Sequence, residues 1–392
     1  MASDSKRAAA ERPRLLVVTR NLPPLRGGME RLNYHVLEEL AREFEVRVCC
    51  PRDCAGQLPE SVAGSFVALK PLSRFVLSSA AGAVGLALRF RPRLVLAGSG
   101  LTAPAALLAA RACGAKAGAY LHGLDVLIDN PVYQHLWVPR LRALDLVIAN
   151  SRATAQLAAG AGVAPERIRI IHPGAAMPAI DLPRAESFRS CLAIGQRPLL
   201  LSVGRLTERK GLPQFLESAM PAVVAAIPDI LFAIVGTEAV DSLKRHRGSE
   251  RQRIEAAVAR LHLGDNVRLL GALTDAELDA AFYAASALAF PVIAVPGDIE
   301  GFGMVAVEAA AHGVPTVAFD VGGINDAVAD GVSGVLCAPG DYGSMARALI
   351  AAAGERSVAA QRRAQCRNFA EQFAWPKFGE RIREACRKAV GG

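Results

Sequence analysis

The sequence has few aromatic residues, and its cysteines form no paired motif. Phe, Trp and Tyr make up 5% of the 392 residues, so a single-stranded nucleic-acid platform built on stacked rings is not expected. The eight cysteines form no C-x-x-C pair and have no companion histidines, and a chain of this size does not need disulfides to fold. We interpret them as buried, reduced thiols of a cytoplasmic protein.

Long apolar segments are also missing. The uncharged stretches 75–88 and 94–110 are 14 and 17 residues long, and a spanning helix needs about 20 largely apolar residues. The first fourteen residues are polar and contain no apolar signal core. We therefore expect a cytoplasmic protein, with peripheral binding to the inner face of the plasma membrane as an open alternative.

The charge that is present is unevenly distributed. Lys and Arg number 45 against 37 Asp and Glu, a net charge of +8, which predicts an anionic partner. Residues 1–175 contain 22 basic and 13 acidic residues, whereas 176–392 contain 23 and 24. Arginines at 74, 89, 91 and 93 bracket the apolar stretch 75–88. This stretch could lie on anionic lipid, or it could be a helix that packs on a sheet.

The length and the apolar pattern predict two α/β domains. One hydrophobic core rarely organises 392 residues. Short runs rich in Val, Ile and Leu alternate with Ala-rich stretches of helical length, which predicts parallel strands buried on both faces. The predicted strands are 15–19, 46–50, 94–97, 117–121, 146–150, 168–171, 199–204, 230–236, 267–271, 287–290, 315–319 and 334–337.

The expected fold class is therefore α/β, with two doubly wound, Rossmann-like parallel-sheet domains that face each other across a cleft. The predicted parts are a polar tail (1–13), a first domain (14–175), a second domain (176–369) and a C-terminal helix (370–392) that crosses back to the first domain. Ligands of such sheets bind beyond the carboxyl ends of the strands, so residues that directly follow strands are the candidates.

Two glycine segments follow strands in the first half. Residues 98–103 match the G-x-G-x-x-A dinucleotide fingerprint, but the next strand ends in Tyr-Leu-His122 instead of an acid, so an ordinary strand-to-helix turn is favoured. Gly27 and Gly28 open a helix and could bring backbone N–H groups close to a phosphate. A flexible turn is the alternative for this pair.

A charged loop follows the first strand of the second half. Residues 204–211 read GRLTERKG, with Arg205 and Lys210 five positions apart. Two cations at a strand end suit a diphosphate that gains charge as it leaves. A solvated charged loop is the alternative. Gly322 and Gly323 follow a later strand and form a second candidate anion cradle.

The most specific pattern lies at residues 298–313. Glu300 precedes two glycines, and a helix is expected to begin near Met304. Residues 304–311 are apolar except for Glu308, so this helix should be buried on most faces. A buried carboxylate is costly without strong hydrogen bonds, which sugar or ribose hydroxyls would supply. A buried Glu–Arg pair is the structural alternative.

In this order, GGMER, HGLD, GRLTERKGL, EGFGMVAVE and VGG resemble family 4 of the retaining glycosyltransferases, which have the GT-B architecture. The resemblance covers nearly the whole chain. The phrase EGFGMVAVEAAAHGVPTVAF is similar to the bacterial mannosyltransferase branch that elongates lipid-linked glycans or phosphatidylinositol mannosides.

The resemblance implies roles for individual residues. It implies catalytic roles for His122, Arg205, Lys210 and Glu300. It implies donor binding by Gly27, Gly28, Arg205, Lys210, Glu300, Gly301, Phe302, Gly303, Met304 and Glu308. The family commonly follows its last glycine pair with Pro-Glu, whereas this chain has Ile-Asn-Asp326, so the role of Asp326 stays open.

We therefore expect a retaining, metal-independent hexosyltransferase. The first donor candidate is GDP-mannose or a related GDP-hexose and the second is a UDP-sugar, with a lipid-linked or polysaccharide-precursor acceptor and an anionic membrane surface as a further partner. No D-x-D triad occurs, so neither a metal nor another cofactor is expected, and no nucleic-acid partner is expected. The alternatives are a two-domain protein that binds a nucleotide or sugar phosphate without transfer and, third, an NAD-linked oxidoreductase.

Overall fold

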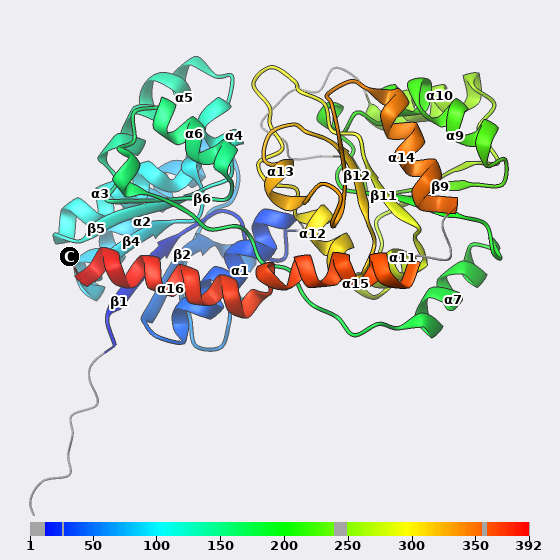
Figure 1. Ribbon diagram of the computed structural model, residues 1–392. Helices are drawn as coiled ribbons and strands as arrows, with labels where there is room; N and C mark the ends of the chain where they lie inside the picture. The colour runs from blue at the N-terminus through cyan, green and yellow to red at the C-terminus, as the bar shows by residue number, and fades with distance from the viewer. Residues whose placement is uncertain (1–11, 26, 239–248, 355–358, 392) are drawn as a thin grey trace, which may run out of the picture. The chain divides into compact units, whose positions relative to one another are not determined.

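The computed structural model describes residues 12–25, 27–238, 249–354 and 359–391. These residues form two α/β units, each built around one parallel sheet (Figure 1). The first unit takes its described residues from Met1–Asn150, Thr154–Ile171 and Pro376–Gly392. The second takes its described residues from Ser151–Ala153 and His172–Trp375.

The first unit contains a seven-stranded sheet in the order β3-β2-β1-β4-β5-β6-β7. Its strands are β1 (Arg14–Val18), β2 (Glu45–Pro51), β3 (Ala63–Val67), β4 (Leu94–Ala97), β5 (Lys116–Leu121), β6 (Leu146–Ala149) and β7 (Ile168–Ile170). Every residue of β4 and β6 is buried, as expected for strands covered by helices on both faces. The strand order reverses between β1 and β4, which makes this edge a topological switch point.

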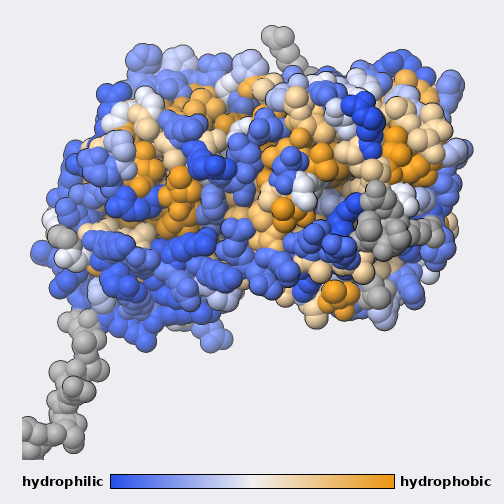
Figure 2. Space-filling view, in the orientation of Figure 1, coloured by the Kyte–Doolittle hydropathy of each residue, from blue (hydrophilic) through white to orange (hydrophobic). Residues whose placement is uncertain are grey.

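Seven described α-helices accompany this sheet. They are α1 (Gly28–Ala41), α2 (Leu72–Phe90), α3 (Ala103–Cys113), α4 (Leu124–Leu127), α5 (Pro131–Leu136), α6 (Arg152–Gly160) and α16 (Trp375–Gly391). The last one, red in Figure 1, is joined to α1 by an ion pair between Arg383 and the buried carboxylate of Glu39. In Figure 2 the surface over α16 is hydrophilic.

The second unit contains a six-stranded sheet in the order β10-β9-β8-β11-β12-β13. Its strands are β8 (Leu199–Val203), β9 (Leu231–Val235), β10 (Val267–Gly271), β11 (Ala287–Phe290), β12 (Thr316–Phe319) and β13 (Gly334–Cys337). Its helices are α7 (Leu182–Cys191), α8 (Leu212–Ser218), α9 (Met220–Ala226), α10 (Glu250–Arg260), α11 (Asp275–Ala284), α12 (Met304–Ala311), α13 (Ile324–Ala327), α14 (Tyr342–Gly354) and α15 (Ala359–Ala370). Here the order reverses between β8 and β11, so this sheet has its own switch point.

All twelve predicted strands occur, and the sheets have the predicted parallel, doubly wound order. The sequence-based prediction missed β3, an edge strand in which only Val67 is buried, so its apolar signal is weak. The helix predicted over 370–392 begins at Trp375, after a 3-10 turn at Glu371–Phe373. Pro376 lies in its first turn, where the missing N–H costs no intrahelical hydrogen bond.

The uncharged stretch 75–88 is the centre of α2, with one buried and one exposed face. Phe75, Ala83 and Ala87 belong to the first unit's core, whereas Leu77 is 72% exposed and Leu88 is 46% exposed. Within the described part of the chain, no helix is both long and apolar enough to cross a membrane. All eight cysteines are free. The expectation of burial is wrong for two of them, because Cys191 is exposed and Cys113 is half-buried.

Candidate active site

Two loops meet at the switch point of the second sheet. Residues 204–211 follow β8, and residues 291–303 follow β11. The Ile293 N–H donates to the Arg209 carbonyl at 2.9 Å and ties the loops together. At Gly211, where φ is +64°, a Cβ atom would lie 2.2 Å from the Pro291 carbonyl oxygen. Only glycine allows this approach, which closes the first loop against the second.

Four charged side chains are packed together between these loops. Lys210 Nζ donates to Glu300 Oε2 at 2.8 Å, and the Arg209 guanidinium pairs with the same carboxylate. Arg209 Nε also lies 3.3 Å from Asp298 Oδ1. The four side chains are only 12–16% exposed. Two buried cations and two carboxylates therefore balance each other at the edge where doubly wound sheets bind ligands.

Burial and neighbouring charges shift the pKa values of Glu300 and Lys210. Burial alone would raise the pKa of Glu300, but the charges and hydrogen bonds of Arg209 and Lys210 outweigh it and lower the pKa to about 2. Burial lowers the pKa of Lys210, and the charges of Arg209 and Arg205 lower it further. The charge and the hydrogen bond of Glu300 raise it, but they do not outweigh the other effects. The Lys210 ammonium is thus the charge that an additional anion would stabilise most.

Lys210 is held at the end of β8 by its neighbours. A Cβ atom on Gly204 would lie 3.2 Å from Lys210 Cε, and Nζ lies 4.5 Å from the centroid of the Phe290 ring. The hydroxyl oxygen of Thr207 is buried and has no hydrogen-bond partner among the described residues. Arg205 is exposed, yet its charge acts on Lys210. The loop thus combines a fixed ammonium with a guanidinium that is open to solvent.

The predicted anion cradle at Gly322–Gly323 has a different use in the structure. The Gly323 N–H donates to the Glu300 carbonyl at 2.9 Å, and a Cβ atom on Gly323 would lie 2.1 Å from the Gly301 carbonyl oxygen. The Gly323 N–H is therefore already bonded, and the following helix, α13, has only four residues. These glycines support the loop that carries Glu300.

Phe302, Gly303, Met304 and Glu308 lie on this loop and on α12. The Phe302 ring is 2% exposed and stacks on His172 with centroids 5.2 Å apart, so only its backbone could face a ligand. Gly303, with φ +93°, begins α12, whose first N–H groups have no intrahelical acceptor. Glu308 is half-buried and shares a helix face with Met304, four residues earlier.

Asp326, whose role the sequence leaves open, is bound by an arginine. Its side chain is 2% exposed and forms an ion pair with Arg152 of the same unit. The Arg152 backbone N–H also donates to Asp326 Oδ2 at 2.6 Å. Both carboxylate oxygens of Asp326 therefore have a donor.

His122 follows β5 in the first unit and is held on three sides. Its Nε2 lies 3.0 Å from the Gly98 carbonyl oxygen, which can only accept, so Nε2 carries a proton. Its backbone N–H donates to Asp125 Oδ2 at 2.8 Å, and its ring stacks on Tyr120. A Cβ atom on Gly98 would lie 2.4 Å from Asn33 Oδ1, so this glycine allows the strand-to-helix turn to pack against α1.

Gly27 and Gly28 lie at the start of α1, beside a carboxylate that sequence reasoning did not single out. A Cβ atom on Gly27 would lie 2.5 Å from Glu30 Oε2. Glu30 is buried and accepts a hydrogen bond from Asn21 Nδ2 at 2.7 Å. The Glu30 carboxylate lies in the first turn of α1, where it interacts favourably with the positive end of the helix. In this structure it fills the space that a side chain at position 27 would need.

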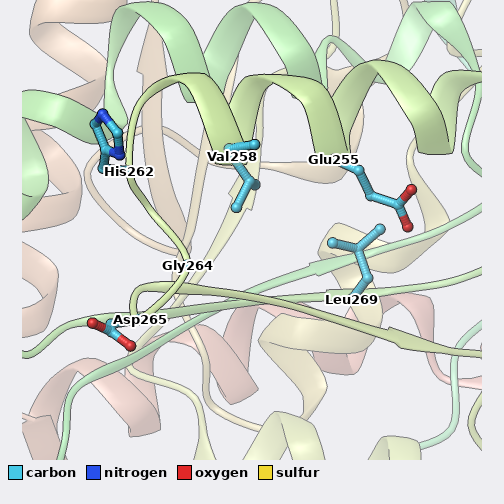
Figure 3. A pocket seen from close by; sticks show the side chains of 7 residues that line it. Glu255, Val258, His262, Gly264, Asp265 and Leu269 are labelled. Atoms are coloured by element: carbon cyan, nitrogen blue, oxygen red, sulfur yellow. The ribbon is translucent and has the colours of Figure 1, made fainter.

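A separate cavity of about 430 Å³ lies between α10 and β10. Figure 3 shows its lining, with Glu255 and His262 on or just after α10 and Asp265 and Leu269 on the opposite side. It contains none of the predicted site residues. Across the described ranges, no group of three or more His, Cys, Asp or Glu residues could hold a metal ion.

Two family models together match most of this chain. Residues 184–373 match the family model "Glycosyl transferases group 1", and residues 26–176 match "Glycosyltransferase Family 4". The D-inositol 3-phosphate glycosyltransferase 1 of Catenulispora acidiphila is 32% identical over 64% of this chain and 59% of that relative. The D-inositol 3-phosphate glycosyltransferase of Segniliparus rotundus is 33% identical over 63% of this chain and 53% of its own length.

The match to these relatives therefore covers between half and three-fifths of their length. Among solved structures, Anabaena HepE in complex with UDP and glucose matches with a TM-score of 0.77 and 22% identity. That match covers 96% of this chain and all of the Anabaena chain. At this level of identity the likeness concerns the fold, which is that of two parallel-sheet α/β units.

Proposed function

We propose, from the premise that this chain belongs to the family 4 glycosyltransferases of GT-B architecture, that it transfers a hexose from a nucleotide sugar with retention at the anomeric carbon. The observation that carries the proposal is the buried cluster of Arg209, Lys210, Asp298 and Glu300. Its cations suit the donor diphosphate, and a carboxylate lies next to them for the sugar hydroxyls.

In this proposal the diphosphate replaces Glu300 as the partner of Lys210. The buried ammonium gains an anion, and the Glu300 carboxylate, still paired with Arg209, becomes available to accept hydrogen bonds from sugar hydroxyls. The exposed Arg205 side chain binds the same diphosphate from the solvent side. Negative charge then develops on the leaving phosphate beside two cations. These cations stabilise the developing charge and so lower the activation barrier.

The other predicted residues keep the roles that the family resemblance implies. The amides of Phe302, Gly303 and Met304 bind the donor sugar with Glu300, and Gly301 allows the loop its turn. Glu308, four residues after Met304, binds the nucleotide ribose. His122 contacts the sugar, and Gly28 allows a close approach to the phosphate. The Gly27 role additionally requires that the Glu30 carboxylate, which lies beside it in this structure, moves away. These roles are proposals for each position.

The proposed reaction is a front-face substitution. The bond between the anomeric carbon and the diphosphate oxygen breaks, and the acceptor oxygen forms the new glycosidic bond on the same face. The departing phosphate oxygen accepts the acceptor's proton. Because Lys210 and Arg205 supply the positive charge that a divalent metal supplies elsewhere, we propose turnover without added metal. Unchanged product formation after EDTA treatment supports this, whereas a loss that Mg²⁺ or Mn²⁺ restores contradicts it.

Two donor classes are to be compared. The Anabaena structure with UDP and glucose supports a UDP-sugar, and the likeness of residues 300–319 to the mannosyltransferase branch supports a GDP-hexose. A thermal-shift series with UDP, GDP and ADP tests both, because a ligand that binds only the folded state raises Tm. A rise with UDP or GDP supports a donor site for that base. No rise with any of the three would contradict the proposal.

The proposed acceptor carries phosphate, in a lipid-linked or polysaccharide-precursor form. The surplus of basic residues in 1–175 favours an anionic acceptor, and the relatives named above act, by their names, on D-inositol 3-phosphate. A binding protein without transferase activity is the remaining alternative. Release of nucleoside diphosphate that depends on the acceptor distinguishes the two.

A membrane surface is proposed as a further partner of the first unit. Besides Leu77 and Leu88 on α2, Leu108 on α3 is 53% exposed, and α2 packs against α3. Arg74 and Arg89 are exposed on the same helix α2. An apolar strip with basic neighbours suits an anionic bilayer. Cosedimentation with phosphatidylglycerol vesicles at low salt, and its loss in Leu77→Ser/Leu88→Ser, is expected. No binding at any salt concentration would contradict it.

A further inference from the structure

The two neighbouring cations of the charged cluster have different surroundings. Arg209 contacts two carboxylates, because its guanidinium pairs with Glu300 and its Nε lies 3.3 Å from Asp298 Oδ1. Among the described residues, the only ion-pair partner of Lys210 is Glu300. Burial lowers the pKa of both cations, but the two carboxylates outweigh it at Arg209 and leave that pKa raised, whereas the pKa of Lys210 stays lowered. The charge of Arg209 is therefore balanced within the protein, and the charge of Lys210 is not.

Arg209 is fixed to the loop that follows β11. Its backbone carbonyl accepts the Ile293 N–H at 2.9 Å, and its guanidinium lies against Asp298. Asp298 is itself held in this loop, because its Oδ1 accepts the Ile299 N–H at 2.9 Å. Moving the Arg209 side chain would break two ion pairs, whereas moving Lys210 breaks one. An incoming anion can therefore take Lys210 from the cluster at a lower cost.

We propose that Arg209 is a positioning residue that keeps Glu300 ionised and in place when the donor diphosphate takes Lys210. Asp298 supports this role by retaining the guanidinium, which would otherwise be free to move to the diphosphate. The inference rests on the proposed function, in which the diphosphate replaces Glu300 as the partner of Lys210. Without Arg209, this exchange would leave a buried carboxylate with no paired cation, and such a group takes up a proton. The neutral acid accepts hydrogen bonds from sugar hydroxyls less strongly than the carboxylate does.

The proton balance of nucleotide binding tests this role. In Arg209→Gln, binding of UDP or GDP should take up about one proton more than in the wild type, because Glu300 is neutralised as it loses Lys210. Nucleotide affinity in this variant should therefore fall by up to about tenfold between pH 7 and pH 8, whereas wild-type affinity should change little. Isothermal titration calorimetry in buffers of different ionisation enthalpy counts the protons. An equal proton count in Arg209→Gln and the wild type overturns the proposal.

Three further variants sharpen the measurement. Arg209→Lys retains a cation next to Glu300 and should restore the wild-type proton count. Arg260→Gln removes an exposed arginine that pairs with Glu217 on the surface, and it should leave the count unchanged. Asp298→Asn releases Arg209 towards the diphosphate, so nucleotide affinity should rise while kcat falls. A high proton count in Arg209→Lys, or a weaker nucleotide affinity in Asp298→Asn, contradicts the proposal.

A ligand-free measurement separates this inference from the proposed function. Lys210→Ala removes the cation that the donor would take, so Glu300 depends on Arg209 alone. The Glu300 carboxyl carbon, observed by NMR after carbon-13 labelling of glutamate, should then report an ionised group from about pH 5 to pH 8. Adding Arg209→Gln should bring its protonation into this interval, and an unchanged signal overturns the proposal. If the wild type transfers no sugar but Glu300 behaves in this way, the proposed function fails and this inference stands.

Discussion

The carboxyl edges of the two sheets have the same topology but different chemistry. Each lies at a reversal of strand order. The second edge buries two cations and two carboxylates in direct contact. At the first edge the buried carboxylates Glu30 and Asp125 accept hydrogen bonds from uncharged donors, the Asn21 amide and the His122 backbone N–H. The basic surplus lies in residues 1–175, whereas the contacts between buried cations and carboxylates lie at the second edge. Burial and pairing, more than net charge, mark the edge suited to a diphosphate.

This difference implies that the two edges contribute differently to turnover, which mutations can test. Groups whose charge is buried should affect the step in which charge develops on the leaving phosphate. Groups that orient through neutral hydrogen bonds should have smaller effects. The two edges therefore predict an ordered series of losses in turnover.

The largest effect is expected at Glu300. Glu300→Ala removes the proposed sugar contact and leaves Arg209 and Lys210 without their shared partner, so kcat should fall by about 10³-fold. Steady-state nucleotide release measures the loss, and circular dichroism checks the fold. Glu208→Gln, an exposed carboxylate in the neighbouring loop, serves as the control with near-normal turnover. Wild-type rates in Glu300→Ala would show that the site is assigned wrongly.

Lys210 is expected to follow. Lys210→Ala should lower kcat by about 10²-fold and weaken nucleotide binding less, because the ammonium acts mainly on the leaving group. Fluorescence or calorimetric titration gives Kd, and turnover gives kcat. Lys116→Ala, at an exposed lysine of the first unit, should change neither. A loss of affinity with an unchanged kcat would favour a binding role alone.

The first edge should be less sensitive. His122→Ala removes an oriented imidazole, and the loss of one hydrogen bond to the sugar should lower turnover about tenfold with little change in donor affinity. Parallel assays with Glu300→Ala make the comparison direct. A loss at His122 as large as that at Glu300 would mean that the two edges do not differ in the way their charges indicate.

The smallest effect concerns stability in acid. The pKa of Glu300 is about 2 in the folded protein against an ordinary 4.5. The ion pairs therefore contribute fully above pH 4.5, and this contribution is lost as the pH falls from 4.5 towards 2. The difference in unfolding free energy between wild type and Glu300→Gln should shrink over that interval, as measured by urea unfolding. A difference that is constant between pH 5 and pH 3 would argue against the buried pair.

Much of the fold could be predicted because buried parallel strands are nearly continuous apolar runs. β3 was missed since most of its residues are exposed at the sheet edge. Lys210 and Glu300, 90 positions apart, could be predicted to lie at one edge because both follow strands. Arg209 was not singled out, because a run of charges does not reveal which cation is buried. That depends on the 3-10 turn at Glu208–Lys210 and on the left-handed Gly211.

The position of α16 has a consequence for biosynthesis. This helix clusters with the first unit, although residues 172–375 of the second unit intervene in the chain. Glu39, whose side chain is 2% exposed, finds Arg383 only once α16 has formed. On the ribosome, α1 must therefore wait, with the Glu39 carboxylate unpaired by Arg383, while the second unit is synthesised and can fold first. The first half of the chain is thus translated first but completed last, and a released chain that ends at residue 375 would contain the whole second unit and a first unit without α16.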